Sequence, residues 1–131
     1  MFRSIAFLIA FTITSSAFAQ KKEMKIRIAE IEIHPQFVTE YIAILKEESR
    51  ASVLLEPGVI SIFPMFQNND STQIRILEIY ANEEAYKNHL TTAHFQKYKT
   101  TTLKMVKSLK LIDMQAIDKE TLSEIFKKQK N

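Results

Sequence analysis

The chain has 131 residues, which is enough for one domain and little more. Its apolar content of 46% supports a packed core, and the absence of cysteine excludes both a disulfide framework and a cysteine-based metal cluster. The formal charge of +3 comes from scattered lysines, so we expect no nucleic-acid partner.

Residues 1–19 have the pattern of a secretory signal peptide. Arg3 gives a positive start, Ile5 to Ile13 form an apolar stretch, and Ala17-Phe18-Ala19 fits the A-x-A cleavage pattern. A membrane anchor would need about 20 continuous apolar residues, and threonine and serine residues interrupt this stretch. We therefore expect secretion across the inner membrane into the periplasm, a short linker at 20–23, and no stable membrane insertion after leader removal.

The first predicted strand is Met24–Ile33, in which apolar and polar residues alternate. The alternation changes phase at Ala29, which indicates either a bulge or a strand buried on both faces. Pro35 suits the first turn of a helix, which is predicted to carry apolar residues at helical spacing from Phe37 to about Leu54.

The turn Glu56-Pro57-Gly58 ends this helix, and the continuous apolar run Val59–Phe66 predicts a strand covered on both faces. Pro64 places that strand at a sheet edge or marks a bulge. Polar turn residues, Gln67 to Ser71, then lead to a third strand at Gln73–Tyr80.

Two helices follow, because Asn82 and Thr92 are good N-cap residues. The first ends near Leu90, and the second carries its apolar residues from Phe95 to Val106. Alternation over Ser108–Ile117 predicts the fourth strand. Residues 118–131 form a C-terminal helical extension that Asp118 caps.

The predicted order is βαββαβ, an α+β ferredoxin-like arrangement spanning residues 24–117. One face of the four-stranded sheet carries the helices. The other face has too few polar residues to meet water, so we expect a homodimer that closes two sheets face to face.

Four short motifs occur in a fixed order along this domain. They are Glu56-Pro57-Gly58, Glu78-Ile79-Tyr80, Ala85-Tyr86-Lys87-Asn88-His89-Leu90 and Thr92-Ala93-His94-Phe95. Their order and spacing resemble those of the antibiotic biosynthesis monooxygenase (ABM) family, and within it the small quinol monooxygenases. The last motif departs from the family's T-P-H-F form, because Ala93 replaces the proline.

The resemblance implies a dimeric α+β barrel with a pocket between the helices and the sheet of each subunit. Family members of known activity oxidise phenols or quinols with O₂ without metal or flavin, and the deprotonated substrate supplies the electrons. We therefore expect an exported, cofactor-independent monooxygenase acting on a small quinol or phenol-like aromatic. The alternatives are a non-catalytic ligand-binding dimer and an isomerase of small signal molecules.

Histidine titrates near neutrality, so His89 and His94 are candidates for the base and for an orienting hydrogen-bond donor. An equal alternative is that both only close the helix junction. Their spacing of five residues across a helix break does not favour a shared face, so no metal site is expected. His34, beside Pro35, is interpreted as a helix-start residue.

Glu78 is the third catalytic candidate, because a carboxylate among Ile74, Ile76 and Tyr80 is costly unless it is paired or protonated. It is either a pocket acid or base with a raised pKa, or the partner of a basic residue across the dimer. Arg75 points to the opposite face and is not an obvious partner. Several aromatic residues could stack on a substrate, and about two of the first six should line a pocket: Tyr80, Phe63, Phe66, Tyr86, Phe95 and Tyr98, with Tyr41 as a further candidate.

Overall fold

The computed structural model describes residues 23–130. The predicted signal peptide lies outside the described residues. Within them, no helix combines the length and apolar character that crossing a bilayer requires.

One antiparallel sheet of four strands forms the base of the fold. Its strands are β1 (Lys25–Ile33), β2 (Val59–Gln67), β3 (Asp70–Tyr80) and β4 (Val106–Met114), arranged in the order β2-β3-β1-β4. With the intervening helices, this is the predicted α+β ferredoxin-like fold.

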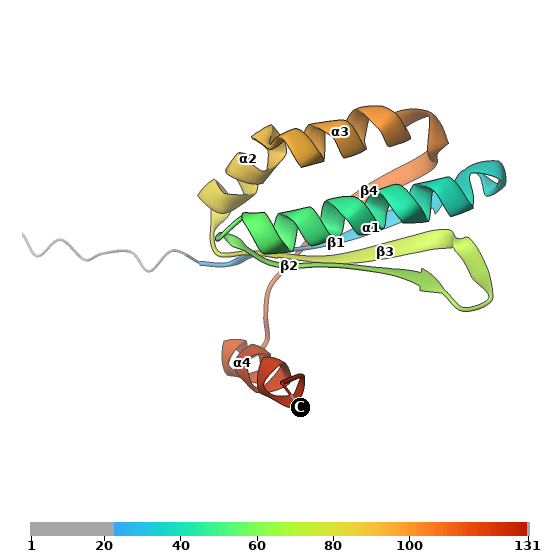
Figure 1. Ribbon diagram of the computed structural model, residues 1–131. Helices are drawn as coiled ribbons and strands as arrows, with labels where there is room; N and C mark the ends of the chain where they lie inside the picture. Colours follow the sequence, from blue (N-terminus) through green and yellow to red (C-terminus); the bar gives the residue numbers. More distant parts are fainter. Residues whose placement is uncertain (1–22, 131) are drawn as a thin grey trace, which may run out of the picture.

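Three helices cover one face of the sheet (Figure 1). They are α1 (Val38–Leu55), α2 (Glu83–Thr91) and α3 (Ala93–Thr102); short 3₁₀ turns, η1 (Pro35–Phe37) and η2 (Leu103–Met105), precede α1 and follow α3. The C-terminal helix α4 (Lys119–Lys128) lies on the other side of the sheet. The Asp118 side chain accepts a hydrogen bond from the Glu120 amide, so Asp118 caps α4 as predicted.

The core lies between the sheet and α1 to α3. It is made mainly of branched aliphatic side chains, with Tyr41 from α1 and Tyr80 from β3 as its fully buried rings. Within β3, the core side chains Ile74, Ile76 and Tyr80 alternate with residues of the opposite face, so Glu78 points towards the helices.

Three boundary predictions need correction. The turn between β2 and β3 is only Asn68 and Asn69, because Gln67 already pairs with Asp70. The α3 helix ends at Thr102 rather than at Val106, which starts β4. Strand β4 therefore begins at Val106 rather than at the predicted Ser108, and it ends at Met114 rather than at the predicted Ile117.

The phase change in β1 is not a bulge. The pairing of β1 with β3 runs without a shift from Lys25 to Glu32. Ala29 and Ile31 are buried under the helices, whereas Ile26 and Ile28 lie on the opposite face. The strand therefore has apolar residues on both faces, but burial on both faces is not seen in a single chain, because Ile26 and Ile28 are only partly buried.

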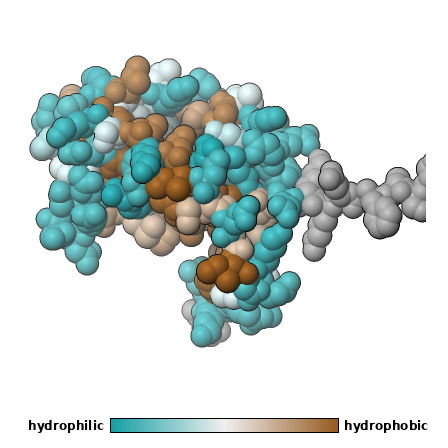
Figure 2. Space-filling model, turned by 180° about the vertical axis from the view of Figure 1, so that it is seen from behind, coloured by the Kyte–Doolittle hydropathy of each residue, from teal (hydrophilic) through white to brown (hydrophobic). Residues whose placement is uncertain are grey.

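Strand β2 lies at the sheet edge, which is one of the two alternatives that Pro64 indicated. The prediction that this strand is covered on both faces is wrong for a single chain. Phe63 is 59% exposed and Phe66 is 51% exposed. Viewed from behind, hydrophobic side chains come to the surface between hydrophilic regions and on the C-terminal helix (Figure 2). A single chain therefore leaves apolar surface open.

Candidate active site

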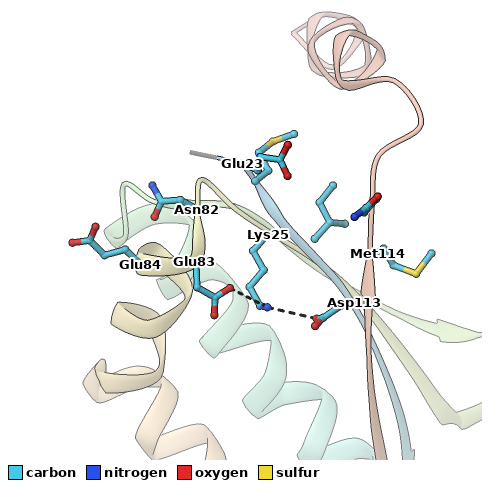
Figure 3. A pocket seen from close by; sticks show the side chains of 10 residues that line it. Glu23, Lys25, Asn82, Glu83, Glu84, Asp113 and Met114 are labelled. Atoms are coloured by element: carbon cyan, nitrogen blue, oxygen red, sulfur yellow. Dashed lines mark ion pairs between the residues drawn. The ribbon is translucent and has the colours of Figure 1, made fainter. Parts of the chain in front are cut away.

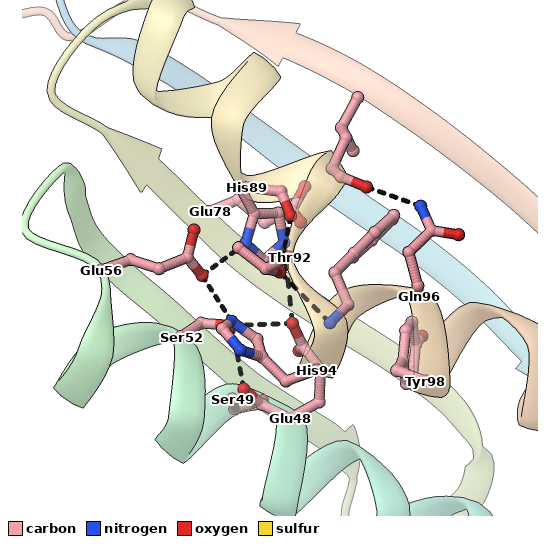
Figure 4. A network of polar contacts seen from close by, with 12 residues as sticks. Glu48, Ser49, Ser52, Glu56, Glu78, His89, Thr92, His94, Gln96 and Tyr98 are labelled. Carbon is pink, nitrogen blue, oxygen red and sulfur yellow. Dashed lines mark hydrogen bonds and ion pairs between the residues drawn. The ribbon is translucent and has the colours of Figure 1, made fainter.

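The two candidate histidines converge although they lie on different helices. His89 is in the last turn of α2, and His94 is in the first turn of α3. Between them Thr92 ends one helix and caps the next, since its side chain accepts a hydrogen bond from the Phe95 amide. Their ring centroids lie 6.2 Å apart (Figure 4). Their spacing in the sequence did not predict this contact.

A single carboxylate oxygen joins the two imidazoles. Glu56 Oε2 lies 2.8 Å from His89 Nδ1 and 2.7 Å from His94 Nε2. A carboxylate oxygen accepts hydrogen bonds, so each ring places an N–H on Glu56. In a neutral imidazole the other ring nitrogen, which is Nε2 of His89 and Nδ1 of His94, can then accept a proton.

The only glycine allows Glu56 to reach this position. A side-chain carbon built at Gly58 would lie 2.5 Å from Ala85 Cβ, so any larger residue would collide with α2. The Gly58 carbonyl oxygen also accepts a hydrogen bond from the Ala81 amide at 2.8 Å. Gly58 is thus required by the close approach of the turn to α2, and its φ is not in the left-handed region.

A second carboxylate, that of Glu48, faces the histidines from helix α1. Glu48 is 5% exposed, and its Oε1 lies 3.6 Å from His89 Nε2. Ser52 donates to the Glu48 carboxylate at 2.7 Å. Burial raises the pKa of the Glu48 carboxyl, whereas the Ser52 hydrogen bond and the nearby histidines oppose that change.

Glu78 lies on the same side of the sheet, and burial raises its pKa as well. Tyr80 donates a hydrogen bond to Glu78 Oε1 at 3.2 Å and partly opposes the rise. Arg27 is opposite Glu78 in the β1–β3 register, and its charge also acts to lower the pKa. The groups that oppose the rise in the Glu78 pKa therefore come from the same chain, with His89 of α2 acting beside Arg27 of β1.

Aromatic rings surround the histidines. Phe95 and Tyr80 lie 4.8 Å and 5.5 Å from the His89 ring, measured between centroids. The hydroxyl groups of Tyr41 and Tyr98 share a hydrogen bond of 2.6 Å, and burial raises the pKa of Tyr98 to about 12. Burial raises the pKa of Tyr41 as well, so both phenols stay protonated at neutral pH.

The remaining predicted aromatic residues lie elsewhere. Tyr86 packs edge-on against Tyr80 and accepts a hydrogen bond from Arg27 at 2.8 Å. Phe63 pairs with Leu77 and so lies on the sheet face opposite Glu78. Phe66 pairs with Ile74, on the helix side, but near the far end of the edge strand. The structure thus does not bring these two phenylalanines to the histidines.

Two acidic residues of this network, Glu48 and Glu56, were missed as functional candidates. Glu48 falls at an apolar position of the α1 repeat, where an acid is unexpected. Glu56 was interpreted only as part of the turn that ends the helix. An acid in an apolar stripe and an acid beside a tight turn were the available signals.

Two hollows lie outside this network. One, of about 670 Å³, is at the end of the sheet, where Lys25 forms ion pairs with Glu83 and Asp113 (Figure 3). The other, of about 900 Å³, follows the β2 edge between α1 and α4 and includes Phe63 and Phe66. Neither is lined by His89 or His94.

Comparison with known protein families identifies one match. The model of the family described as antibiotic biosynthesis monooxygenase matches residues 24–101, more than half of the chain. The chain is also 44% identical to a candidate antibiotic biosynthesis monooxygenase of Bacteroides thetaiotaomicron, with a TM-score of 0.72. That likeness covers 73% of this chain and 91% of the other.

More distant solved structures share the fold. A candidate monooxygenase of Lactobacillus acidophilus is 26% identical, with a TM-score of 0.68, over 72% of this chain but only 46% of the other. A candidate antibiotic biosynthesis monooxygenase of Nitrosomonas europaea is 16% identical, with a TM-score of 0.70, over 75% of this chain and 94% of the other. The search of curated proteins gives no match.

Proposed function

The chain belongs to the antibiotic biosynthesis monooxygenase family, and from this premise we propose that it oxidises a small quinol or phenol-like aromatic with O₂, without a cofactor. The observation that carries this proposal is the pair of imidazoles joined by Glu56. An aromatic hydroxyl must lose its proton before the ring can donate electrons to O₂ at neutral pH. A positioned imidazole is suited to that proton transfer.

His94 is the better base of the two. Its side chain is 19% exposed, whereas that of His89 is 2% exposed, so a substrate can reach His94 more easily. His94 Nε2 is held by Glu56, which leaves Nδ1 to accept the substrate proton. The imidazolium formed in this way would be stabilised by the carboxylate at 2.7 Å, as in a nucleophile–histidine–carboxylate triad.

His89 and the surrounding rings would position the reacting groups. His89 donates to the same Glu56 oxygen and so fixes the carboxylate that orients His94. Phe95 and Tyr98 are next to each other, with ring centroids 6.3 Å apart, and offer apolar surface for an aromatic ring. For a hydroquinone, the overall reaction gives a hydroxyquinone and water, and each product receives one oxygen atom of O₂.

Oxygen uptake with a panel of hydroquinones tests this proposal. We expect consumption by the wild type and a fall of about 10²-fold or more in His94→Ala. His34→Ala is the control, because His34 lies at η1, outside the network. Absence of uptake by the wild type, or equal rates in wild type and His94→Ala, would contradict the proposal. Substrate turnover without O₂ would indicate an isomerase, and binding without consumption a ligand-binding protein.

The open apolar surface supports a homodimer as the working form. Ile26 and Ile28 of β1 and Phe63 of β2 lie on the sheet face opposite the helices α1 to α3. Covering such a face by a second copy would shield it from water. The N-terminal leader pattern supports export to the periplasm, and mature protein beginning at Gln20 in a periplasmic fraction would be the expected result.

A further inference from the structure

The same network contains a set of metal-binding donor atoms. Glu48, His89 and His94 each offer one donor atom, and these atoms all lie within 4.8 Å of one another. Donors bound to one ion at about 2.1 Å are separated by roughly 3 to 3.5 Å. A small inward movement of these side chains would therefore place all three around one ion.

The hydrogen bonds of Glu56 are arranged as metal-binding histidines require. Such histidines usually donate one ring N–H to a carboxylate, which fixes the ring, and bind the ion through the other nitrogen. His89 and His94 each use one nitrogen on Glu56. The second nitrogen of His89 faces Glu48 at 3.6 Å, which is too long for a hydrogen bond.

Charge provides a second, independent argument. Within residues 23–130, all ion pairs of Glu48 and Glu56 are with histidines, and no lysine or arginine is among their partners. Glu48 is 5% exposed and His89 is 2% exposed, so water screens these groups poorly. Buried carboxylates are costly without a cation, and a divalent ion would compensate both.

We propose that Glu48, His89 and His94 bind one divalent first-row transition metal ion, held in place by Glu56 behind the histidines. Two imidazoles and one carboxylate favour ions such as Zn²⁺ over Ca²⁺ or Mg²⁺, which prefer oxygen ligands alone. Because the ion takes the nitrogens that proton transfer needs, its binding inhibits the oxygenase. This last consequence rests on the proposed function, whereas metal binding itself does not.

Isothermal titration calorimetry of the tag-free, chelator-treated chain with ZnCl₂ tests whether the site binds the metal ion. We expect one ion per chain with a dissociation constant of roughly 1 μM or below. Glu48→Gln should weaken binding by about tenfold or more, and His94→Gln likewise. Glu47→Gln and His34→Gln are matched controls that should change the dissociation constant by less than about twofold, because Glu47 is an exposed acid next to Glu48 and His34 lies outside the cluster.

Thermal unfolding of each metal-free variant checks that it folds, and the visible spectrum with Co²⁺ in place of Zn²⁺ gives a second measure. Coordination by the cluster predicts Co²⁺ absorption bands in the wild type that weaken in either variant of the donor residues. No binding at 100 μM Zn²⁺, equal binding by Glu48→Gln and wild type, or loss of binding in His34→Gln would overturn the proposal.

Oxygen uptake separates this inference from the proposed function. Zn²⁺ should inhibit uptake, and excess chelator should restore it. If the metal-free wild type consumes no oxygen but binds Zn²⁺ at Glu48, the proposed function fails and the metal site stands. If Zn²⁺ binds and uptake rises, the inhibitory consequence is overturned.

Discussion

Replacing Glu56 by alanine should destabilise the protein and disable the candidate site together. The change removes the oxygen that accepts hydrogen bonds from His89 and His94. His89 is 2% exposed, so its Nδ1–H would lose its acceptor without gaining water, at a cost of about 1–3 kcal/mol. His94 is more exposed and can recruit water, which limits its loss to about 1 kcal/mol.

The expected total is therefore about 2–4 kcal/mol of unfolding free energy. For a domain of this size, each 1 kcal/mol shifts the melting temperature by roughly 4 °C, so Glu56→Ala should melt about 8–16 °C below wild type. Thermal unfolding followed by circular dichroism at neutral pH measures the shift. Glu56→Gln keeps an acceptor oxygen but loses the negative charge, so its melting temperature should lie between those of the wild type and Glu56→Ala.

Glu47→Ala is the matched control, because Glu47 of α1 forms an ion pair with Lys97 of α3 in which both side chains are 67% exposed. Exposed pairs contribute little, and this variant should melt within about 2 °C of wild type. The reasoning would be refuted if Glu56→Ala melted as close to wild type as this control. Retention of wild-type oxygen uptake by Glu56→Ala would refute the part that assigns Glu56 to the reaction.

Three further predictions address the turn, the buried acid and the open face. Gly58→Ala should lower the free energy of unfolding in urea by about 1–3 kcal/mol, because the new methyl group collides with Ala85. Adding Ala85→Gly to this variant should recover part of the loss, and a double variant no more stable than Gly58→Ala would contradict the steric explanation. Burial raises the pKa of Glu78 above its usual 4.5, so the folded state holds this proton more tightly and the free energy of unfolding falls as the pH rises above 4.5. Glu78→Gln should remove this fall. Parallel curves of stability against pH for the wild type and Glu78→Gln would contradict the prediction. Phe63→Glu should convert the proposed dimer to single chains, as measured by sedimentation velocity. Leu103 of η2 is 74% exposed, so Leu103→Glu is the control and should leave the dimer intact. An unchanged sedimentation coefficient in Phe63→Glu would argue against pairing through this face of the sheet.

Local patterns predicted most of the element order. Alternation and helical spacing located the four strands and four helices, because burial of one face imposes these periods on the sequence. The caps at Asn82 and Thr92 were also predictable, since each side chain bonds to an amide three residues on. The wrong predictions concern the ends of elements, such as the end of α3 at Thr102. There, pairing with the neighbouring strand decides where β4 begins, and local sequence preference does not.

The sequence by itself therefore determined the ferredoxin-like order, the helix break at Thr92 and the identity of the two histidines as candidates, whereas the strand order decided that β2 lies at the edge. Only the tertiary structure decided that the histidines meet on Glu56, which lies 33 and 38 positions away from them in the chain. It also decided that Glu48 is buried beneath them and that Phe63 lies on the opposite face of the sheet. The physical reason is that periodicity records which face of one element is buried, whereas the partner across the core depends on how α1, the Gly58 turn and α2 pack together in space.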